Sequence, residues 1–171
     1  MIMERAWISR LPLNIIREVA SETNVPWNLL AAIVQTESSG NAFAARFEPD
    51  YKYYFKVKEF AKANQITDIT ETVLQKTSWG LCQLMGGLCR ELGHNGSLLE
   101  VLDQELNLRL CAKHLVNLIK KYPDRDAMLA AYNGGSPIKD MKTGKYRNQE
   151  YVDKVLGYFA ELNETFGIKL T

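Results

Sequence analysis

Residues 27–40 have the sequence WNLLAAIVQTESSG, in which the stretch Leu29–Val34 is apolar without interruption. A helix that is apolar around most of its circumference passes through the core of a domain rather than over its surface. Pro26 is tolerated where a helix begins, and Ser38-Ser39-Gly40 supplies residues that end one. The sequence therefore predicts a buried helix with Glu37 in its last turn.

Glu37 has the surroundings that a general acid requires. A carboxylate at the carboxyl end of a helix faces the negative end of the helix dipole, and Ile33 and Val34 would remove water from it. Both effects favour the protonated form and raise the pKa, and a carboxyl that gives up a proton near neutrality needs a pKa of about 6. The alternative from this residue alone is a solvated glutamate in a final turn.

Helical periodicity extends over most of the remaining chain, and no run of alternating residues predicts a strand. Further helices are expected near residues 12–23, 51–64, 68–76, 104–121 and 124–132, with a last one from Tyr151 to Phe166. Asp68 and Glu71 have the spacing of a capping box, and residues 41–49 are expected to form a loop. The predicted fold class is all-α, with little or no sheet.

Length and charge limit the possible functions. A chain of 171 residues with 46% hydrophobic content suits a single domain, residues 1–171. The formal charge of +1 provides no broad cationic field for nucleic acid, and we interpret Lys139, Lys142, Lys145 and Arg147 as a solvated loop. No apolar stretch is long enough to cross a bilayer, so no stable membrane insertion is expected.

Cysteine and histidine positions do not predict a metal centre. Cys82, Cys89 and Cys111 are odd in number and lack CxxC spacing, which favours reduced thiols in the core. His94 and His114 lie 20 positions apart, and neither is near a cluster of cysteines and carboxylates. No metal and no cofactor are expected.

Four short motifs follow one another along the chain. They are Glu37-Ser-Ser-Gly, Trp79-Gly-Leu-Cys-Gln-Leu-Met85, Ala131-Tyr-Asn-Gly-Gly135 and Tyr151-Val-Asp-Lys-Val155. Each is weak evidence alone, but the set in this order resembles the soluble lytic transglycosylase and goose-type lysozyme superfamily over about residues 25–156.

The resemblance implies a lysozyme-like helical fold and an enzyme that cleaves the β-1,4 bond between N-acetylmuramic acid and N-acetylglucosamine in peptidoglycan. It implies that Glu37 is the catalytic acid, that Gln83 and Met85 line the sugar groove, and that Tyr132 forms a hydrogen bond near the acid, followed by Asn133 in the same motif. Amides and flat or soft apolar surfaces suit sugar hydroxyls, N-acetyl groups and ring faces.

Several of these residues also have structural interpretations. Ser39 and Tyr151 are counted with Gln83, Met85 and Asn133 as substrate-binding residues, but Tyr151 could equally belong to the core. Met85 lies on an apolar stripe with Leu81, Leu84 and Leu88 and could be a core residue, and Tyr132 could be a packing aromatic.

The sequence departs from the resemblance in two places. About twenty residues usually separate the glutamate from the glycine turn, but Glu37 and Gly80 are 43 apart, which predicts an inserted helical segment at about 44–76. Its opening Arg46–Asp50, with Ser78-Trp79-Gly80, resembles muramidases and phage endolysins. Gly86-Gly87 stands where proline is common, and we assign it no chemistry.

The reaction type depends on a second carboxylate. A hydrolytic muramidase needs one at about 5 to 9 Å from the acid, and Glu48 or Asp50 could supply it. A lytic transglycosylase needs none, because the muramic 6-hydroxyl attacks and leaves a 1,6-anhydro end. We favour the transglycosylase, with Glu48 as a candidate second catalytic residue; alternatively Glu48 is a loop residue paired with Arg46 or water.

A rival hypothesis from another class is an inactive wall-binding or virion structural protein with the same fold.

Residues 1–10 lack the pattern of a secretory signal. We therefore expect a monomeric phage or prophage enzyme that is made in the host cytoplasm and acts on the cell wall, either released through a holin or carried by the virion.

Overall fold

The computed structural model of the chain describes residues 5–168. Residues 1–4 and 169–171 lie outside the described residues, so the expectation about a secretory signal at residues 1–10 falls partly outside them. The elements in chain order are η1 (Ile8–Arg10), α1 (Leu13–Thr23), α2 (Trp27–Ser38), β1 (Ala45–Phe47), α3 (Val57–Ala63), α4 (Asp68–Gln75), β2 (Thr77–Trp79), β3 (Leu84–Met85), α5 (Gly86–Glu91), η2 (Leu98–Leu102), α6 (Gln104–Lys121), α7 (Arg125–Gly134) and α8 (Gln149–Phe166). Helices make up most of the fold, as predicted. Within residues 5–168 no helix combines the length and the apolar character needed to cross a membrane.

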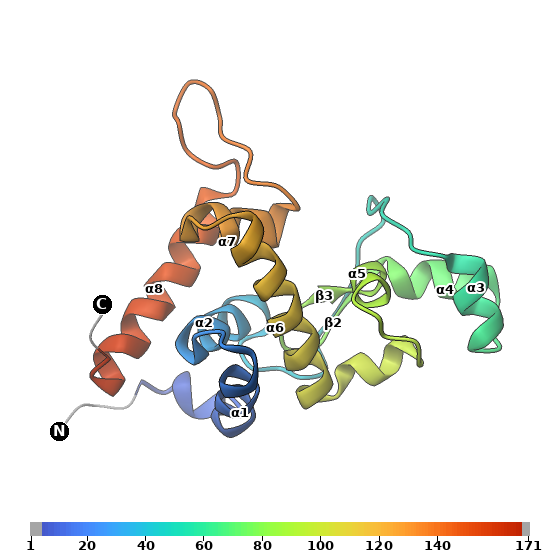
Figure 1. Ribbon diagram of the computed structural model, residues 1–171, viewed down its shortest axis with the longest axis horizontal. Helices are drawn as coiled ribbons and strands as arrows, with labels where there is room; N and C mark the ends of the chain where they lie inside the picture. The colour runs from blue at the N-terminus through green and yellow to red at the C-terminus, as the bar shows by residue number, and fades with distance from the viewer. Residues whose placement is uncertain (1–4, 169–171) are drawn as a thin grey trace.

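Helix α2 forms the centre of the molecule. Every residue from Asn28 to Gln35 is buried, which confirms the prediction of a core helix. The helix packs against α8 and α1, and in Figure 1 it lies between α8 and α6. The chain leaves α2 at Ser39, which adopts the left-handed conformation. The last turn of α2, with Glu37, is thereby held in place by the surrounding helices.

A small antiparallel sheet in the order β1-β2-β3 follows the core helix. Ala45 pairs with Trp79 in the first ladder, and Ser78 pairs with Met85 in the second. The strands contain only two or three residues each, too few for an alternating pattern to be detected in the sequence. For this reason the sequence predicts a loop at residues 41–49, where the structure has β1.

The segment at 44–76 differs in part from the prediction. Residues 51–56 are not helical, and α3 begins only at Val57, after Lys56 in a left-handed conformation. The N–H and C=O groups of Phe55 bond to the side chain of Gln75 instead of to a helix ladder. In Figure 1, α3 and α4 form one end of the molecule, opposite α7 and α8.

The start of α4 also corrects an expectation. Thr67, not Asp68, caps the helix, and its side chain accepts a hydrogen bond from the N–H of Thr70. Glu71 is fully buried and forms an ion pair with Arg90 of α5. The spacing of a capping box is therefore misleading here, because the glutamate is required for a tertiary contact.

Candidate active site

Glu37 lies in the last turn of α2, half-buried, with one oxygen bound to a tyrosine. The hydroxyl of Tyr151, in the first turn of α8, donates a hydrogen bond of 2.7 Å to Oε1 of Glu37. Burial raises the pKa of the Glu37 carboxyl above its ordinary value, and the Tyr151 hydrogen bond, with the charges of Arg46 and Lys154, offsets part of this effect. The predicted direction of the pKa shift is confirmed.

Tyr132 does not form a hydrogen bond with Glu37. Its hydroxyl donates a hydrogen bond of 2.8 Å to the carbonyl oxygen of Cys82 and lies 3.4 Å from the sulfur of Cys111. Burial raises the pKa of Tyr132 well above its usual range. Tyr132 thus ties α7 to the turn between β2 and β3. The partner of the carboxyl is instead Tyr151, for which the sequence predicts a core position or a sugar contact.

The turn between β2 and β3 is held by its own side chains. Gln83 adopts a left-handed conformation, and its amide donates to the carbonyl oxygens of Ala44 and Gly80 at 3.0 and 2.9 Å. Its Oε1 accepts from the hydroxyl of Ser78 at 3.0 Å. Both amide protons of Gln83 are therefore used within the protein, and only its oxygen retains capacity for a ligand.

Two residues link this turn to the core helices. Ser38, beside Glu37, donates a hydrogen bond of 2.8 Å to the carbonyl oxygen of Leu81. Asn107 of α6 is fully buried; its oxygen accepts from the N–H of Cys82, and its amide donates to the carbonyl oxygen of Trp79, each at 2.9 Å. We did not predict Asn107, although an amide four residues before Cys111 on an apolar stripe is a detectable signal.

Most of the predicted residues line one groove of about 680 Å³, here called the central groove. The predicted site residues that line it are Glu37, Glu48, Gln83, Met85, Tyr132 and Asn133. Met85 is half-buried and contributes to the wall, and Asn133 is exposed. Ser39 is the C-cap of α2 and is exposed, and it is not part of the groove wall.

The candidate second carboxylates occupy different places. Glu48 lines the central groove, but its Oε1 lies 2.5 Å from Nε of Arg46 in an ion pair. Asp50 is exposed and is not part of the groove wall. Of these two candidates, Glu48 is therefore the one that lines the groove with Glu37, and it is already paired with the guanidinium of Arg46.

His114 of α6 is a groove residue that we did not predict. Its ring lies 5.5 Å from the ring of Tyr132, and burial lowers its pKa to about 4. The imidazole is therefore neutral near pH 7. Within residues 5–168 no three His, Cys, Asp or Glu side chains come together in a way that could hold a metal ion.

Comparison with known protein families gives a match that covers most of the chain. Residues 14–154 match the family model described as the transglycosylase SLT domain, and this range contains every side chain placed in the site above. No curated protein matches the chain at a significant level.

Proposed function

Because the chain belongs to the transglycosylase SLT domain family, whose members are glycosidases of peptidoglycan, we propose that it cleaves the β-1,4 bond between N-acetylmuramic acid and N-acetylglucosamine with Glu37 as both acid and base. The products are glycan fragments that end in 1,6-anhydro-N-acetylmuramic acid. No water enters this reaction, so a single carboxyl is sufficient.

In the first step the protonated Glu37 gives its proton to the glycosidic oxygen, and the bond from that oxygen to the anomeric carbon of the muramic unit breaks. General acid catalysis requires the proton to be present near the working pH, and burial of Glu37 favours that form. The N-acetyl group of the substrate stabilises the positive charge that develops at the anomeric carbon.

In the second step the Glu37 carboxylate takes the proton of the muramic 6-hydroxyl, whose oxygen bonds to the anomeric carbon. This closes the 1,6-anhydro ring and restores the protonated acid. The Tyr151 hydroxyl, bound to Oε1 of Glu37, stabilises the carboxylate between the two steps and fixes its orientation. Tyr151 is thus a positioning residue.

The observation that best supports the proposal is the contrast between Glu37 and Glu48, two of the glutamates that line the central groove. Glu37 has a raised pKa and a neutral hydrogen-bond partner, whereas Glu48 has a guanidinium as its partner. An ion-paired carboxylate is a weaker nucleophile and base than a free one. This favours a mechanism in which Glu37 acts without Glu48.

A hydrolytic muramidase is the second candidate, since Glu48 lines the same groove as Glu37. In that reaction Glu48 would separate from Arg46 and either attack the anomeric carbon or activate a water molecule. The product would then carry a reducing end.

The function is tested by turnover of purified sacculi. Glu37→Gln is expected to reduce the release of soluble fragments by at least about 10²-fold, the usual scale for loss of a general acid. Glu18→Gln, at an exposed position of α1, is the matched control and should retain full activity. A folded Glu37→Gln variant with undiminished turnover would refute the assignment.

The biological setting is a further part of the proposal. We propose a phage or prophage lysis enzyme, supported by the resemblance of Arg46–Asp50 and Ser78-Trp79-Gly80 to endolysin sequences. Coexpression with a holin in a bacterial host is the test. Lysis that needs both proteins supports holin-dependent release, and lysis by the enzyme alone contradicts it.

A further inference from the structure

The segment Tyr51–Phe55 rests directly on Gly87 of α5, and α4 rests on the neighbouring Gly86. A β-carbon on Gly87 would lie 2.6 Å from the carbonyl oxygen of Tyr53 and 3.0 Å from the hydroxyl of Tyr51. A β-carbon on Gly86 would collide with the carbonyl oxygen of Leu74 in α4. The two glycines, for which the sequence indicated no purpose, therefore allow the inserted segment to approach α5 closely.

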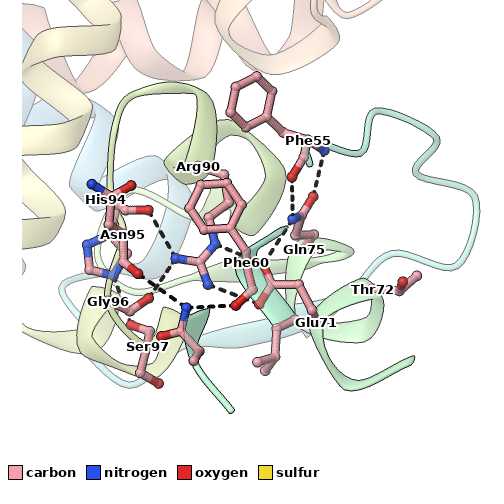
Figure 2. A network of polar contacts seen from close by, with 12 residues as sticks. Phe55, Phe60, Glu71, Thr72, Gln75, Arg90, His94, Asn95, Gly96 and Ser97 are labelled. Carbon is pink, nitrogen blue, oxygen red and sulfur yellow. Dashed lines mark hydrogen bonds and ion pairs between the residues drawn. The ribbon is translucent and has the colours of Figure 1, made fainter. Parts of the chain in front are cut away.

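Buried polar contacts hold the segment in this position (Figure 2). The side chain of Gln75 bonds to both backbone groups of Phe55 at 2.8 Å and donates to Glu71 at 2.9 Å. The carboxylate of Glu71 accepts from Nε and Nη2 of Arg90 at 2.8 and 3.0 Å, and neither side chain is exposed. Arg90 also donates to the backbone carbonyl of His94 at 3.0 Å.

This anchoring brings two tyrosines to the wall of the central groove. Tyr53 lines the groove and is 73% exposed, so its ring is open to a ligand in the groove. Its ring packs edge-on against Tyr51, with the centroids 5.6 Å apart. Tyr51 is half-buried, and burial raises its pKa to about 12, so its hydroxyl remains a donor.

Polar groups surround these rings. Glu91, at the end of α5, lines the same groove and is exposed. A flat apolar face beside a carboxylate and a phenolic hydroxyl is suited to a pyranose, whose ring face is apolar and whose rim carries hydroxyl and N-acetyl groups.

We propose that Tyr53, Tyr51 and Glu91 form an additional subsite for an N-acetylhexosamine unit of the glycan strand. The inference rests on the proposed function, because it takes the strand bound at Glu37 to continue along the groove. The ring of Tyr53 stacks on the sugar, the Tyr51 hydroxyl donates to it, and Glu91 accepts from its hydroxyls. The subsite makes the enzyme favour longer strands.

The inference is tested by calorimetric titration of N-acetylglucosamine oligomers of three to six units into the Glu37→Gln variant, which leaves them intact. We expect affinity to increase with oligomer length. Adding Tyr53→Ala should weaken binding of the longest oligomer by roughly 3- to 10-fold, the range for one aromatic contact, and leave the shortest unaffected. Tyr53→Phe keeps the stacking face and should bind as tightly as the parent.

Tyr54→Ala is the matched control, because Tyr54 is also exposed, at 46%, but is not part of the groove wall. Equal affinities of Tyr53→Ala and its parent at every length would overturn the inference, as would equal losses in Tyr53→Ala and Tyr54→Ala or the absence of any length dependence in the parent. Binding is measured apart from cleavage. Failure of the proposed function would appear as unchanged turnover of sacculi by Glu37→Gln. Failure of the subsite would appear as unchanged oligomer binding by Tyr53→Ala, so the two results are distinguishable.

Discussion

The hydroxyl of Tyr151 donates a 2.7 Å hydrogen bond to Oε1 of Glu37, although 114 residues separate the two in sequence. The contact joins the first turn of α8 to the last turn of α2, two helices that pack against each other along the core. The orientation of the proposed acid therefore depends on the docking of the final helix.

Replacement of Tyr151 by phenylalanine tests this contact. The hydrogen bond lowers the pKa of Glu37, so its loss should raise that pKa further and shift the alkaline limb of the pH–rate profile to higher pH. The maximal rate should fall by about 10-fold because the carboxyl loses its orientation. Tyr158→Phe, on the same helix, should leave the profile unchanged; an unshifted profile in Tyr151→Phe would contradict the positioning role.

The raised pKa of Glu37 also predicts how stability depends on pH. The folded state binds this proton more tightly than the unfolded state, so the resulting stability is present below the ordinary carboxyl pKa and is lost as pH rises through the folded pKa. At pH 7 Glu37→Gln should unfold at higher urea concentration than wild type, and the difference should shrink at pH 4. A wild type that is the more stable protein at pH 7 argues against a desolvated carboxyl.

His114 gives a pH dependence of the opposite sign. Its pKa is about 4 in the folded protein against 6.5 ordinarily, so the unfolded state takes up the proton first as pH falls. As pH falls from 7 to 4, this preferential protonation of the unfolded state should lower the unfolding free energy by about 2–3 kcal/mol. His114→Gln should remove that part of the acid sensitivity in urea titrations, and equal pH dependence in both proteins would be the contrary result.

Both side chains of the Glu71–Arg90 ion pair are fully buried. We therefore expect replacement of one partner to destabilise the protein much more than replacement of both. Arg90→Met or Glu71→Gln alone leaves an uncompensated group and should cost about 3–5 kcal/mol of unfolding free energy. The double change to methionine should recover most of this loss. Single variants that unfold like wild type would show that the pair is not needed to hold α4 on α5.

The helices that were predicted well are those whose pattern is long and local. The uninterrupted apolar run of α2 and the stripe of α6 each extend over several turns, so periodicity alone gave their positions and placed Glu37 at a helix end. The resemblance then identified Gln83, Met85, Tyr132 and Asn133, all of which line the groove.

The features that were missed depend on contacts between distant parts of the chain. Residues 51–56 have a helical pattern, but Gln75, 20 residues away, bonds to the backbone of Phe55 and holds it outside a helix. The strands are too short to show alternation, and the Tyr151–Glu37 bond has no local signature. Asn107 and His114 were detectable only as polar residues on the buried side of α6.

The most direct test of the account is mass spectrometry of the fragments that wild-type protein releases from sacculi, with Glu48→Gln examined beside it. If Glu37 acts alone, both proteins release muropeptides with 1,6-anhydro ends, each lighter by one water than its hydrolysed counterpart. Reducing ends from wild type, together with loss of activity in Glu48→Gln, would contradict the account and assign the enzyme a two-carboxylate hydrolytic mechanism.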